Sequence, residues 1–414
     1  MRFPPSARRT PDSPDDGTVG RKGRGGVVIL NWRDTRNPEG GGSEQYVERI
    51  AAGLAARGRP VTMVCASWHG AAREERRDGI RILRRGSRLT VYLWAALLYL
   101  GGRLGPHEVV VDVQNGLPFF SALYARRPVV VLCHHVHREQ WRVLFPAPVA
   151  RLGWWIESRL APWLYRRCRY VTVSESSRRE LVDLGVAAAS IRIVRNGTDV
   201  PAAPGGIAKS PYPSICVLGR LVPHKRVELA LEAAARIRQQ APDLRVLVAG
   251  QGWWEARVRQ AAARLGLDGA VRLLGYVDEP TKHALLARSW VLAMPSLKEG
   301  WGLAVMEAAG HGTPAVGFRS AGGLGEAIVD GVTGLLADDA DELARQLTRV
   351  ITDRGLRERL GAAARARAAH FTWPATADAF AAVLEDAVAA ARGQGTSVVT
   401  GVAARPSAGA QRLP

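Results

Sequence analysis

Short runs of apolar residues alternate with longer segments of mixed character along the chain, and this pattern predicts the secondary structure. The segment EQYVERIAAGLAARG at 44–58 has the apolar spacing of an amphipathic helix. Around it lie short runs rich in valine and isoleucine, which predict buried strands: GVVIL at 26–30, PVTMVCA at 60–66, IRILR at 80–84, EVVVDV at 108–113, PVVVLCHH at 128–135 and YVTVSE at 170–175. Such strands, alternating with helical segments, are typical of a doubly wound parallel sheet.

A second series of the same kind follows a Pro/Gly/Ser-rich segment at 201–213, which has the composition of a linker. Its expected strands are SICVLGR, RVLVAG, VRLLG, WVLAMPS and TPAVGF, and its expected helices lie at 227–240, 254–265, 280–288 and 341–353. The predicted fold class is therefore α/β, with two doubly wound parallel-sheet (Rossmann-like) domains. Ligands of such sheets bind at the carboxyl ends of the strands, so we expect a cleft between two facing domains.

The same pattern sets the expected domain boundaries. Residues 25–200 form the first domain and residues 214–370 the second. A long amphipathic helix, FTWPATADAFAAVLEDAVAAARG, is expected at 371–393. The ends of the chain, 1–24 and 394–414, have the polar or small-residue composition of disordered tails.

The longest uncharged apolar run, LTVYLWAALLYLGG at 89–102, lies between Arg88 and Arg103. A helix that crosses a bilayer needs about 20 apolar residues, and this run is shorter. We interpret it as a buried helix, with an interfacial membrane helix as the alternative. Residues 1–24 contain no apolar segment of the kind that secretory signals carry.

Composition narrows the class of partner. The formal net charge is +19 over 414 residues, which favours nucleic acid, an anionic membrane or phosphorylated ligands. The arginines are spread along the chain without interleaved aromatic residues, so nucleic acid is not expected. The four cysteines show no metal-ligand spacing and are expected to be buried free thiols in a reducing cytosol: Cys65, Cys133, Cys168 and Cys216.

The segment KEGWGLAVMEAAGHGTPAVG at 298–317 has the pattern of a loop after a strand, followed by a helix that begins near Leu303. Gly300 and Gly302 let the backbone approach a ligand closely, and the free N–H groups at the start of the helix suit a phosphate. The same residues are also compatible with an ordinary loop and helix.

Four charged residues suggest which ligand this loop serves. Glu299 and Glu307 would repel an anion, so hydroxyl groups are their expected partners. Arg220 and Lys225 follow the strand that ends at Gly219, where they would neutralise a diphosphate. A nucleotide sugar has this layout of phosphates between two hydroxyl-rich groups, whereas scattered surface charges are the competing explanation.

Two further loops follow predicted strands in the first half. NPEGGGSE at 37–44 contains three consecutive glycines at 40–42, which permit close backbone approach from the opposite domain. His134, His135 and His137 lie at or just past the end of the strand expected at 128–135. At this place a polar lining of a site is favoured over a metal centre, because no carboxylate cluster accompanies the histidines.

Two motifs are interpreted as coincidental. The glycines of Gly250-Gln251-Gly252 resemble a dinucleotide fingerprint, but Glu255 stands where a third glycine or alanine is needed. Asp339 and Asp341 match the DxD with which some sugar-transfer enzymes hold a metal ion, but they are better explained as the cap of the helix that follows.

Taken together, these motifs resemble the retaining glycosyltransferases of family 4 (group 1), which have the GT-B fold. The resemblance covers roughly residues 25–390 and is most specific in the second half. It is carried by these segments: the E-x7-E pair at 299–307, GRLVPHK at 219–225, GGSE at 41–44, VSESSRRELVDLG at 173–185, RNGTD at 195–199 and FTWPATADAF at 371–380.

The resemblance implies a role for each matching residue of the second domain. Arg220 and Lys225, next to Gly219, would bind the donor diphosphate. Glu307 would hold the ribose hydroxyls, and Glu299 would hold the hydroxyls of the transferred sugar. The backbone that would meet the sugar and the distal phosphate belongs to Gly300, Trp301, Gly302 and Leu303.

The resemblance also implies roles for the first domain and for the end of the chain. Gly42 would approach the phosphates from the first domain, and His134 would line the reaction centre. The helix at 371–393 would cross back to the first domain. Three positions differ from the common pattern: Trp301 stands for phenylalanine, Arg226 for glycine and His135 for aspartate, and the last of these concerns the acceptor side.

The resemblance implies a retaining, metal-independent transfer of a hexose from a UDP- or GDP-sugar, with no cofactor, to a glycan, lipid-linked or small-molecule acceptor in envelope or glycoconjugate biosynthesis. The expected location is the cytoplasm, with peripheral contact at an anionic inner membrane face left open. The alternatives are a catalytically silent nucleotide-sugar-binding protein and, from the motif at 250–252, a nicotinamide-dependent oxidoreductase.

Overall fold

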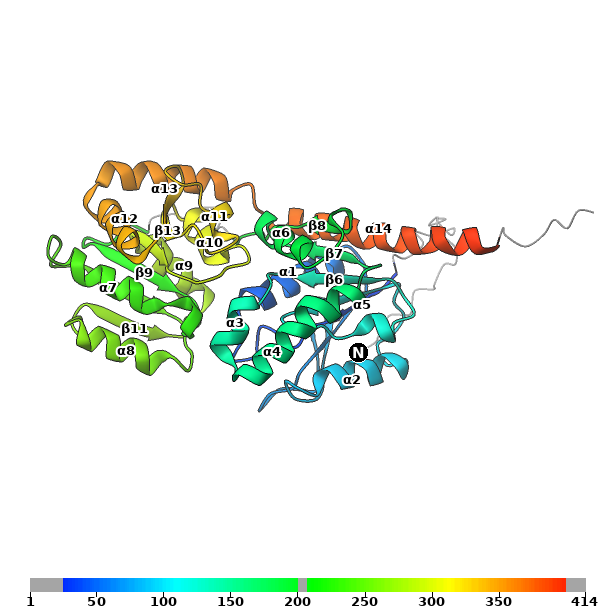
Figure 1. Ribbon diagram of the computed structural model, residues 1–414. Helices are drawn as coiled ribbons and strands as arrows, with labels where there is room; N and C mark the ends of the chain where they lie inside the picture. Colours follow the sequence, from blue (N-terminus) through cyan, green and yellow to red (C-terminus); the bar gives the residue numbers. More distant parts are fainter. Residues whose placement is uncertain (1–24, 200–206, 400–414) are drawn as a thin grey trace, which may run out of the picture.

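The computed structural model describes residues 25–199 and 207–399, which form two α/β domains (Figure 1). The first domain contains an eight-stranded sheet in the order β3-β4-β2-β1-β5-β6-β7-β8. Every neighbouring pair is parallel except β3 with β4. The strands are β1 (Val27–Leu30), β2 (Val61–Cys65), β3 (Glu74–Arg77), β4 (Ile80–Arg84), β5 (Val109–Gln114), β6 (Val129–Cys133), β7 (Arg169–Thr172) and β8 (Ile191–Ile193).

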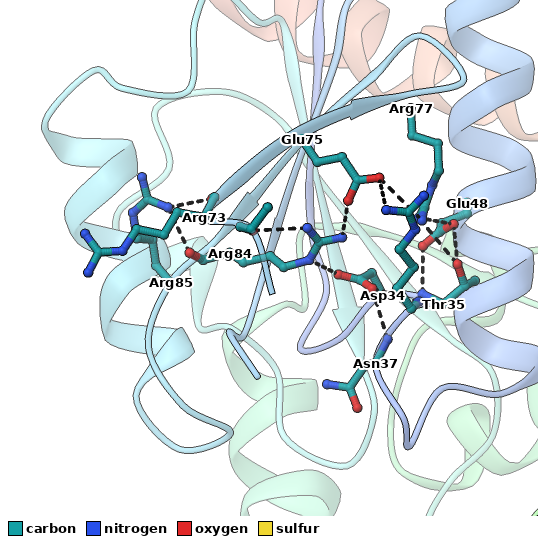
Figure 2. A network of polar contacts seen from close by, with 11 residues as sticks. Asp34, Thr35, Asn37, Glu48, Arg73, Glu75, Arg77, Arg84 and Arg85 are labelled. Carbon is teal, nitrogen blue, oxygen red and sulfur yellow. Dashed lines mark hydrogen bonds and ion pairs between the residues drawn. The ribbon is translucent and has the colours of Figure 1, made fainter. Parts of the chain in front are cut away.

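The antiparallel edge strand β3 is not predicted by the pattern, because its sequence EERR contains no apolar run. Ion pairs hold it in place: Arg84 donates from Nε to Asp34 (2.5 Å) and from Nη2 to Glu75 on β3 (2.8 Å), as Figure 2 shows. Asp34 also accepts hydrogen bonds from the backbone N–H groups of Arg36 and Asn37. These contacts fix the loop that leads from β1 to the first helix.

Helices cover both faces of this sheet. One face carries α1 (Gly42–Ala56). The opposite face packs in a separate apolar layer against α2 (Val91–Leu100), a continuous helical rod and α6 (Glu175–Asp183). The rod consists of α4 (Ala147–Trp155), a π-helical turn (Ile156–Leu160) and α5 (Ala161–Leu164), and α3 (Arg138–Leu144) precedes it. The predicted burial of the helix at 89–102 is right for one side of α2 only, since the other side is exposed.

The second domain has a six-stranded, fully parallel sheet in the order β11-β10-β9-β12-β13-β14. Its strands are β9 (Ser214–Leu218), β10 (Arg245–Ala249), β11 (Val271–Gly275), β12 (Val291–Met294), β13 (Ala315–Phe318) and β14 (Gly334–Ala337). Its helices are α7 (Val227–Ile237), α8 (Glu255–Arg264), α9 (Glu279–Arg288), α10 (Leu303–Gly310), α11 (Leu324–Ala327), α12 (Ala340–Thr352) and α13 (Arg354–Ala368).

The last helix, α14 (Trp373–Val399), returns from the second domain and packs on α1 of the first (Figure 1). The two helices are so close that a Cβ built on Gly53 would lie 2.5 Å from Ala377 Cβ. The crossing helix implied by the family resemblance is therefore present, and it continues beyond 393 to Val399. The expected tails at 1–24 and 400–414 and the start of the linker, 200–206, lie outside the described residues.

The part of the linker that the structure describes, 207–213, lies along the second domain. Lys209 donates from Nζ to the carbonyl oxygen of Ser289 (2.8 Å), and the backbone N–H of Ser210 donates to the carbonyl oxygen of Arg288 (2.9 Å). None of the helices in 25–199 and 207–399 has both the length and the hydropathy needed to span a bilayer.

Candidate functional site

The loops after the strands of the two sheets meet where the domains face each other. Gly42 begins α1, and Leu303 begins α10 in the other domain. A Cβ built on Gly42 would lie 3.5 Å from Leu303 Cδ2. Gly300 contacts the first domain still more closely, because a Cβ there would lie 2.6 Å from the carbonyl oxygen of His134. The structure therefore brings predicted residues of both domains together, and the contact at Gly300 has no room for a side chain.

Positive charge gathers at the end of β9. Gly219, Arg220 and Lys225 line a small pocket between the ends of β9 and β12. The Arg220 guanidinium reaches toward the first domain, where its Nη1 donates to the carbonyl oxygen of Glu39 (3.5 Å). Burial and the nearby Arg33 guanidinium both lower the pKa of Arg220. Like charges at short range in a part-buried place create a site that favours an anion.

The glycine-rich loop of the first domain is held by a buried glutamate. Glu44 accepts hydrogen bonds from Nε of Arg33 (2.8 Å) and from the backbone N–H of Gly41 (2.8 Å), which lies just before α1. Burial by itself raises the pKa of Glu44, but the Arg33 guanidinium outweighs this effect, and the net pKa is lowered. The ion pair and the hydrogen bond to Gly41 fix the position of the start of α1 at the domain boundary.

Glu299 lies in the loop after β12 and pairs with Lys225, whose Nζ is 2.5 Å from Glu299 Oε1. The backbone of this loop is also fixed, because Glu299 N–H donates to the carbonyl oxygen of Ala321 (3.1 Å) and Gly323 N–H donates to that of Glu299 (3.0 Å). One of the predicted diphosphate cations and one of the predicted sugar-binding carboxylates are thus direct neighbours.

The start of α10 has the predicted position, at Leu303. Gly302 is its N-terminal cap residue and has a φ of 104°, a left-handed conformation that favours glycine. Trp301 is buried, and its ring packs 5.4 Å from that of Phe371, centroid to centroid. The Trp301 side chain therefore belongs to the core, and only its backbone faces the site.

Glu307 lies on α10 and is 4% exposed. Lys282 on α9, itself buried, donates from Nζ to Glu307 Oε1 (2.7 Å). Burial raises the pKa of Glu307, and the Lys282 ammonium opposes this effect. A carboxylate so deep keeps its charge only with such a partner, so Lys282 holds Glu307 in place as an acceptor.

His134 follows β6 and is buried, with its ring edge-on to Tyr46 at 5.1 Å between centroids. Burial lowers the pKa of His134 to about 4, so the imidazole is neutral at physiological pH. Within the described part of the chain its Nε2 has no hydrogen-bond partner. A buried polar atom without a partner, in a residue whose carbonyl group lies against Gly300, is suited to a ligand group.

The neighbouring histidines are engaged in the first domain. His135 Nε2 lies 3.0 Å from Gln140 Oε1, and His137 Nδ1 lies 3.0 Å from Oε1 of buried Glu157. In 25–199 and 207–399 no group of three or more His, Cys, Asp or Glu side chains is arranged to hold a metal ion.

The two coincidental motifs have structural explanations. Asp339 caps α12, since its side chain accepts the Glu342 N–H (2.7 Å), as expected. Gly250 and Gly252 let two loops pack tightly: Cβ atoms built there would lie 1.9 Å and 2.1 Å from the carbonyl oxygens of Gly219 and Leu221. These glycines position the loop that carries Arg220.

Arg226 occupies a left-handed conformation, with a φ of 48°, which explains why glycine is common at this position in the family. Its guanidinium offsets the strain by donating to the carbonyl oxygens of Pro295 (2.9 Å) and Ser296 (3.0 Å) and by lying 4.5 Å from the Phe318 ring centroid.

We expect Arg226→Ala to lower the free energy of unfolding by about 2–4 kcal/mol, because the contacts are lost while the strain remains. Arg226→Gly loses the same contacts but also relieves the backbone strain, because glycine adopts a left-handed φ without cost, so it should be more stable than the alanine variant by about 1 kcal/mol. Urea unfolding of both variants measures this difference. Equal stabilities would show that the backbone at residue 226 is not strained.

Several residues that build the site were not singled out by the sequence. Arg33 lies three residues after the end of β1, and this position in the loop after a strand was its only signal. Lys282 is 25 residues from Glu307 and has no signal in the sequence. The domains are also joined by Glu326, which accepts the N–H groups of Glu175 (3.0 Å) and Ser176 (2.7 Å) at the start of α6.

Two facing domains of this kind, with a last helix that returns to the first, define the GT-B fold. Solved structures share it. Sucrose-phosphate synthase from Thermosynechococcus elongatus has a TM-score of 0.75 at 19% identity, over 89% of this chain and 100% of that one. Anabaena Alr3699/HepE in complex with UDP-glucose has a TM-score of 0.69 at 19% identity, over 88% and 100%.

Sequence comparison gives the family. The model described as Glycosyltransferase Family 4 matches residues 40–201, and the model described as Glycosyl transferases group 1 matches residues 206–367. The chain belongs to the glycosyltransferases of family 4 (group 1), and it is a glycosyltransferase.

Curated relatives carry two different names. Glycogen synthase of Mycobacterium tuberculosis (strain CDC 1551 / Oshkosh) is 27% identical over 393 residues, which cover 86% of this chain and 92% of the relative. D-inositol 3-phosphate glycosyltransferase of Kribbella flavida is 33% identical over 230 residues, or 50% and 54% of the two chains.

Proposed function

We propose that this glycosyltransferase moves a hexose from a UDP- or GDP-sugar to its acceptor with retention of anomeric configuration and without a metal ion. The observation that supports this most directly is that Arg220 and Lys225 line a pocket at the carboxyl ends of β9 and β12, while Arg220 and Leu303, the first residue of α10, lie against two adjacent glycines of the first domain, Gly41 and Gly42. A structural relative, Anabaena Alr3699/HepE, was solved with UDP-glucose, which supports a nucleotide-sugar donor.

The main energetic problem of the reaction is the negative charge that develops on the leaving diphosphate. In our proposal Arg220 and Lys225 neutralise it from one side, and the N–H groups at the start of α10 do so along the helix axis. Gly42 brings the start of α1 to the same place from the first domain. These groups would do the work that a divalent cation does in other transferases.

The two glutamates would hold the two ends of the donor. Glu307, kept charged by Lys282, accepts hydrogen bonds from the ribose hydroxyls, and Glu299 accepts them from the transferred sugar. In this scheme the Lys225 ammonium, which pairs with Glu299, would orient the Glu299 carboxylate as well as bind phosphate. Neutral His134 offers its free Nε2 to the sugar at the reaction centre.

Retention follows in this scheme when the acceptor hydroxyl attacks from the face that the diphosphate leaves, and the leaving phosphate accepts the acceptor's proton. The bond from the anomeric carbon to the diphosphate breaks as the new glycosidic bond forms. Cleft closure would exclude water and limit hydrolysis. The free cysteines of the described chain fit a reducing cytoplasm as the place of action.

A thermal-shift screen with UDP, GDP and their hexose conjugates tests the proposal. We expect one nucleoside diphosphate to raise the melting temperature, and its hexose conjugate to be turned over by the enzyme. No stabilisation by either nucleotide would contradict the donor assignment, and binding without transfer or hydrolysis would contradict the catalytic roles.

Substitutions of the two glutamates should have different effects on nucleotide affinity and on kcat. Glu307→Gln, which preserves shape, should weaken nucleoside-diphosphate binding about ten-fold, because a buried ribose partner loses its charge. Glu299→Gln should leave that affinity within about three-fold but lower kcat about 100-fold, because it touches the reacting sugar. Calorimetry and turnover assays measure the two effects. Glu255→Gln, at a partly exposed position on α8 where the side chain pairs with Arg259, is the control. Identical profiles for the Glu307 and Glu299 variants would refute the division of roles.

A further inference from the structure

One face of the first domain exposes apolar side chains to solvent. On α2, the inner side is buried, but the outer side shows Leu93 (63% exposed), Leu97 (52%) and Leu100 (61%). Twelve of the nineteen large exposed apolar side chains of the described chain lie between residues 89 and 163. Solvent-exposed apolar groups gathered in this way mark an interaction surface.

The helical rod of α4 and α5 adds to this face. Trp155 (53% exposed) and Trp163 (61%) point outward from it, with Arg159 between them along the chain. Because α2 and the rod pack on the same side of the first sheet, their outer sides belong to one face of the domain (Figure 1). We call these outer sides of α2, α4 and α5 the apolar face.

The charge of this segment is strongly one-sided. Between residues 86 and 168 ten arginines are exposed, and Glu139 is the one exposed acidic residue, since Glu108 is partly covered and Asp112 and Glu157 are buried. Exposed tryptophans and leucines flanked by arginines complement the interface of a bilayer with anionic lipids. Nucleic acid would not require the exposed leucines, and a protein partner would bury them without needing ten arginines against one exposed acidic residue, so the charge favours an anionic lipid surface.

We propose that the apolar face binds an anionic phospholipid surface and that the enzyme acts on an acceptor carried by that membrane. At 10 residues, α2 is about 15 Å long, half the thickness of a bilayer core, so it lies in the interface rather than crossing it. The apolar face is connected to the cleft through α3, which precedes α4 in the chain. This helix starts beside the His134 loop and contacts the turn that carries Lys225.

The acceptor part of this inference rests on the proposed function, whereas membrane binding does not. A lipid-linked acceptor in the membrane would therefore enter past α3 to the sugar end of the site. Such acceptors share two parts: a polar headgroup that carries a phosphate or a glycan, and an apolar anchor that stays in the membrane.

Vesicle flotation with the full chain tests membrane binding. We expect the protein to float with vesicles of phosphatidylcholine and phosphatidylglycerol, and much less with phosphatidylcholine alone. Leu93→Gln with Leu97→Gln should weaken partitioning at least about ten-fold. Arg151→Gln with Arg159→Gln should weaken it about five-fold for each arginine, and added salt should mimic that effect. Equal binding of wild type and both double variants would overturn the proposal.

Matched controls are available in the second domain. Val332→Gln, at a residue that is 52% exposed, and Arg272→Gln, on exposed β11 surface, should leave partitioning unchanged. Unchanged melting temperatures show that the variants are folded. If one of the double variants does not fold, Trp155→Gln with Trp163→Gln takes its place in the flotation assay. If the wild type is a dimer that the leucine variants dissociate, and it ignores vesicles, a second copy covers the face and the proposal is wrong.

Discussion

Arg220→Ala is expected to lower kcat by about 10²–10³-fold, the size of effect seen when one charge-stabilising donor is removed from an active site. The guanidinium reaches the glycine-rich loop of the first domain, and under the proposed function its loss would leave the diphosphate with Lys225 alone on that side. Arg220→Lys keeps a charge without the forked geometry and should recover only part of the rate. Single-turnover kinetics with saturating donor isolate the chemical step.

The fold should survive this change, because Glu44 retains its partner Arg33 when Arg220 is removed. The melting temperature without ligand should therefore be close to that of wild type. Arg272→Ala, on the exposed surface of β11, is the matched control and should keep full activity. A loss of less than about ten-fold for Arg220→Ala would remove the diphosphate role from this residue.

The second large expected effect is a loss of folding stability at acidic pH. Burial lowers the pKa of His134, His224 and His311 to about 4, each with additional repulsion from neighbouring cations or imidazoles. The unfolded chain takes up these protons near pH 6.5, so stability is full above that pH and falls as the pH drops from 6.5 to about 4. For His134, which is fully buried, the cost at pH 5 is roughly 2 kcal/mol, an appreciable part of the 5–15 kcal/mol typical of a folded protein.

Urea unfolding at a series of pH values measures this loss. We expect these three imidazoles to contribute little change in the free energy of unfolding above pH 7, and a steep fall between pH 6.5 and about 4. His311→Gln, at the end of α10 away from Gly302, should make the fall shallower by about one proton. His69→Gln, at an exposed position, is the control for the substitution itself. A flat profile down to pH 5 would show that the three imidazoles are not held neutral.

Much of the fold was readable from local patterns. Continuous valine and isoleucine runs predict buried parallel strands because both faces of such a strand are covered, and the strands at 27–30, 109–114 and 291–294 were found this way. The start of α10 at Leu303 was predicted from glycine and apolar spacing. The edge strand β3 was missed because its backbone pairing with β4 and its ion pairs, rather than buried apolar side chains, hold it.

The sequence by itself determined two alternating α/β series, the family, and the residues Gly42, His134, Arg220, Lys225, Glu299 and Glu307 as candidates. Only the tertiary structure decided what these residues contact: Glu299 meets Lys225, Glu307 meets Lys282, which the sequence did not single out, and the carbonyl group of His134 meets Gly300. It also decided that one side of α2 is uncovered. Periodicity reports the local face of an element, whereas contacts between residues distant in sequence depend on how the two sheets are placed against each other.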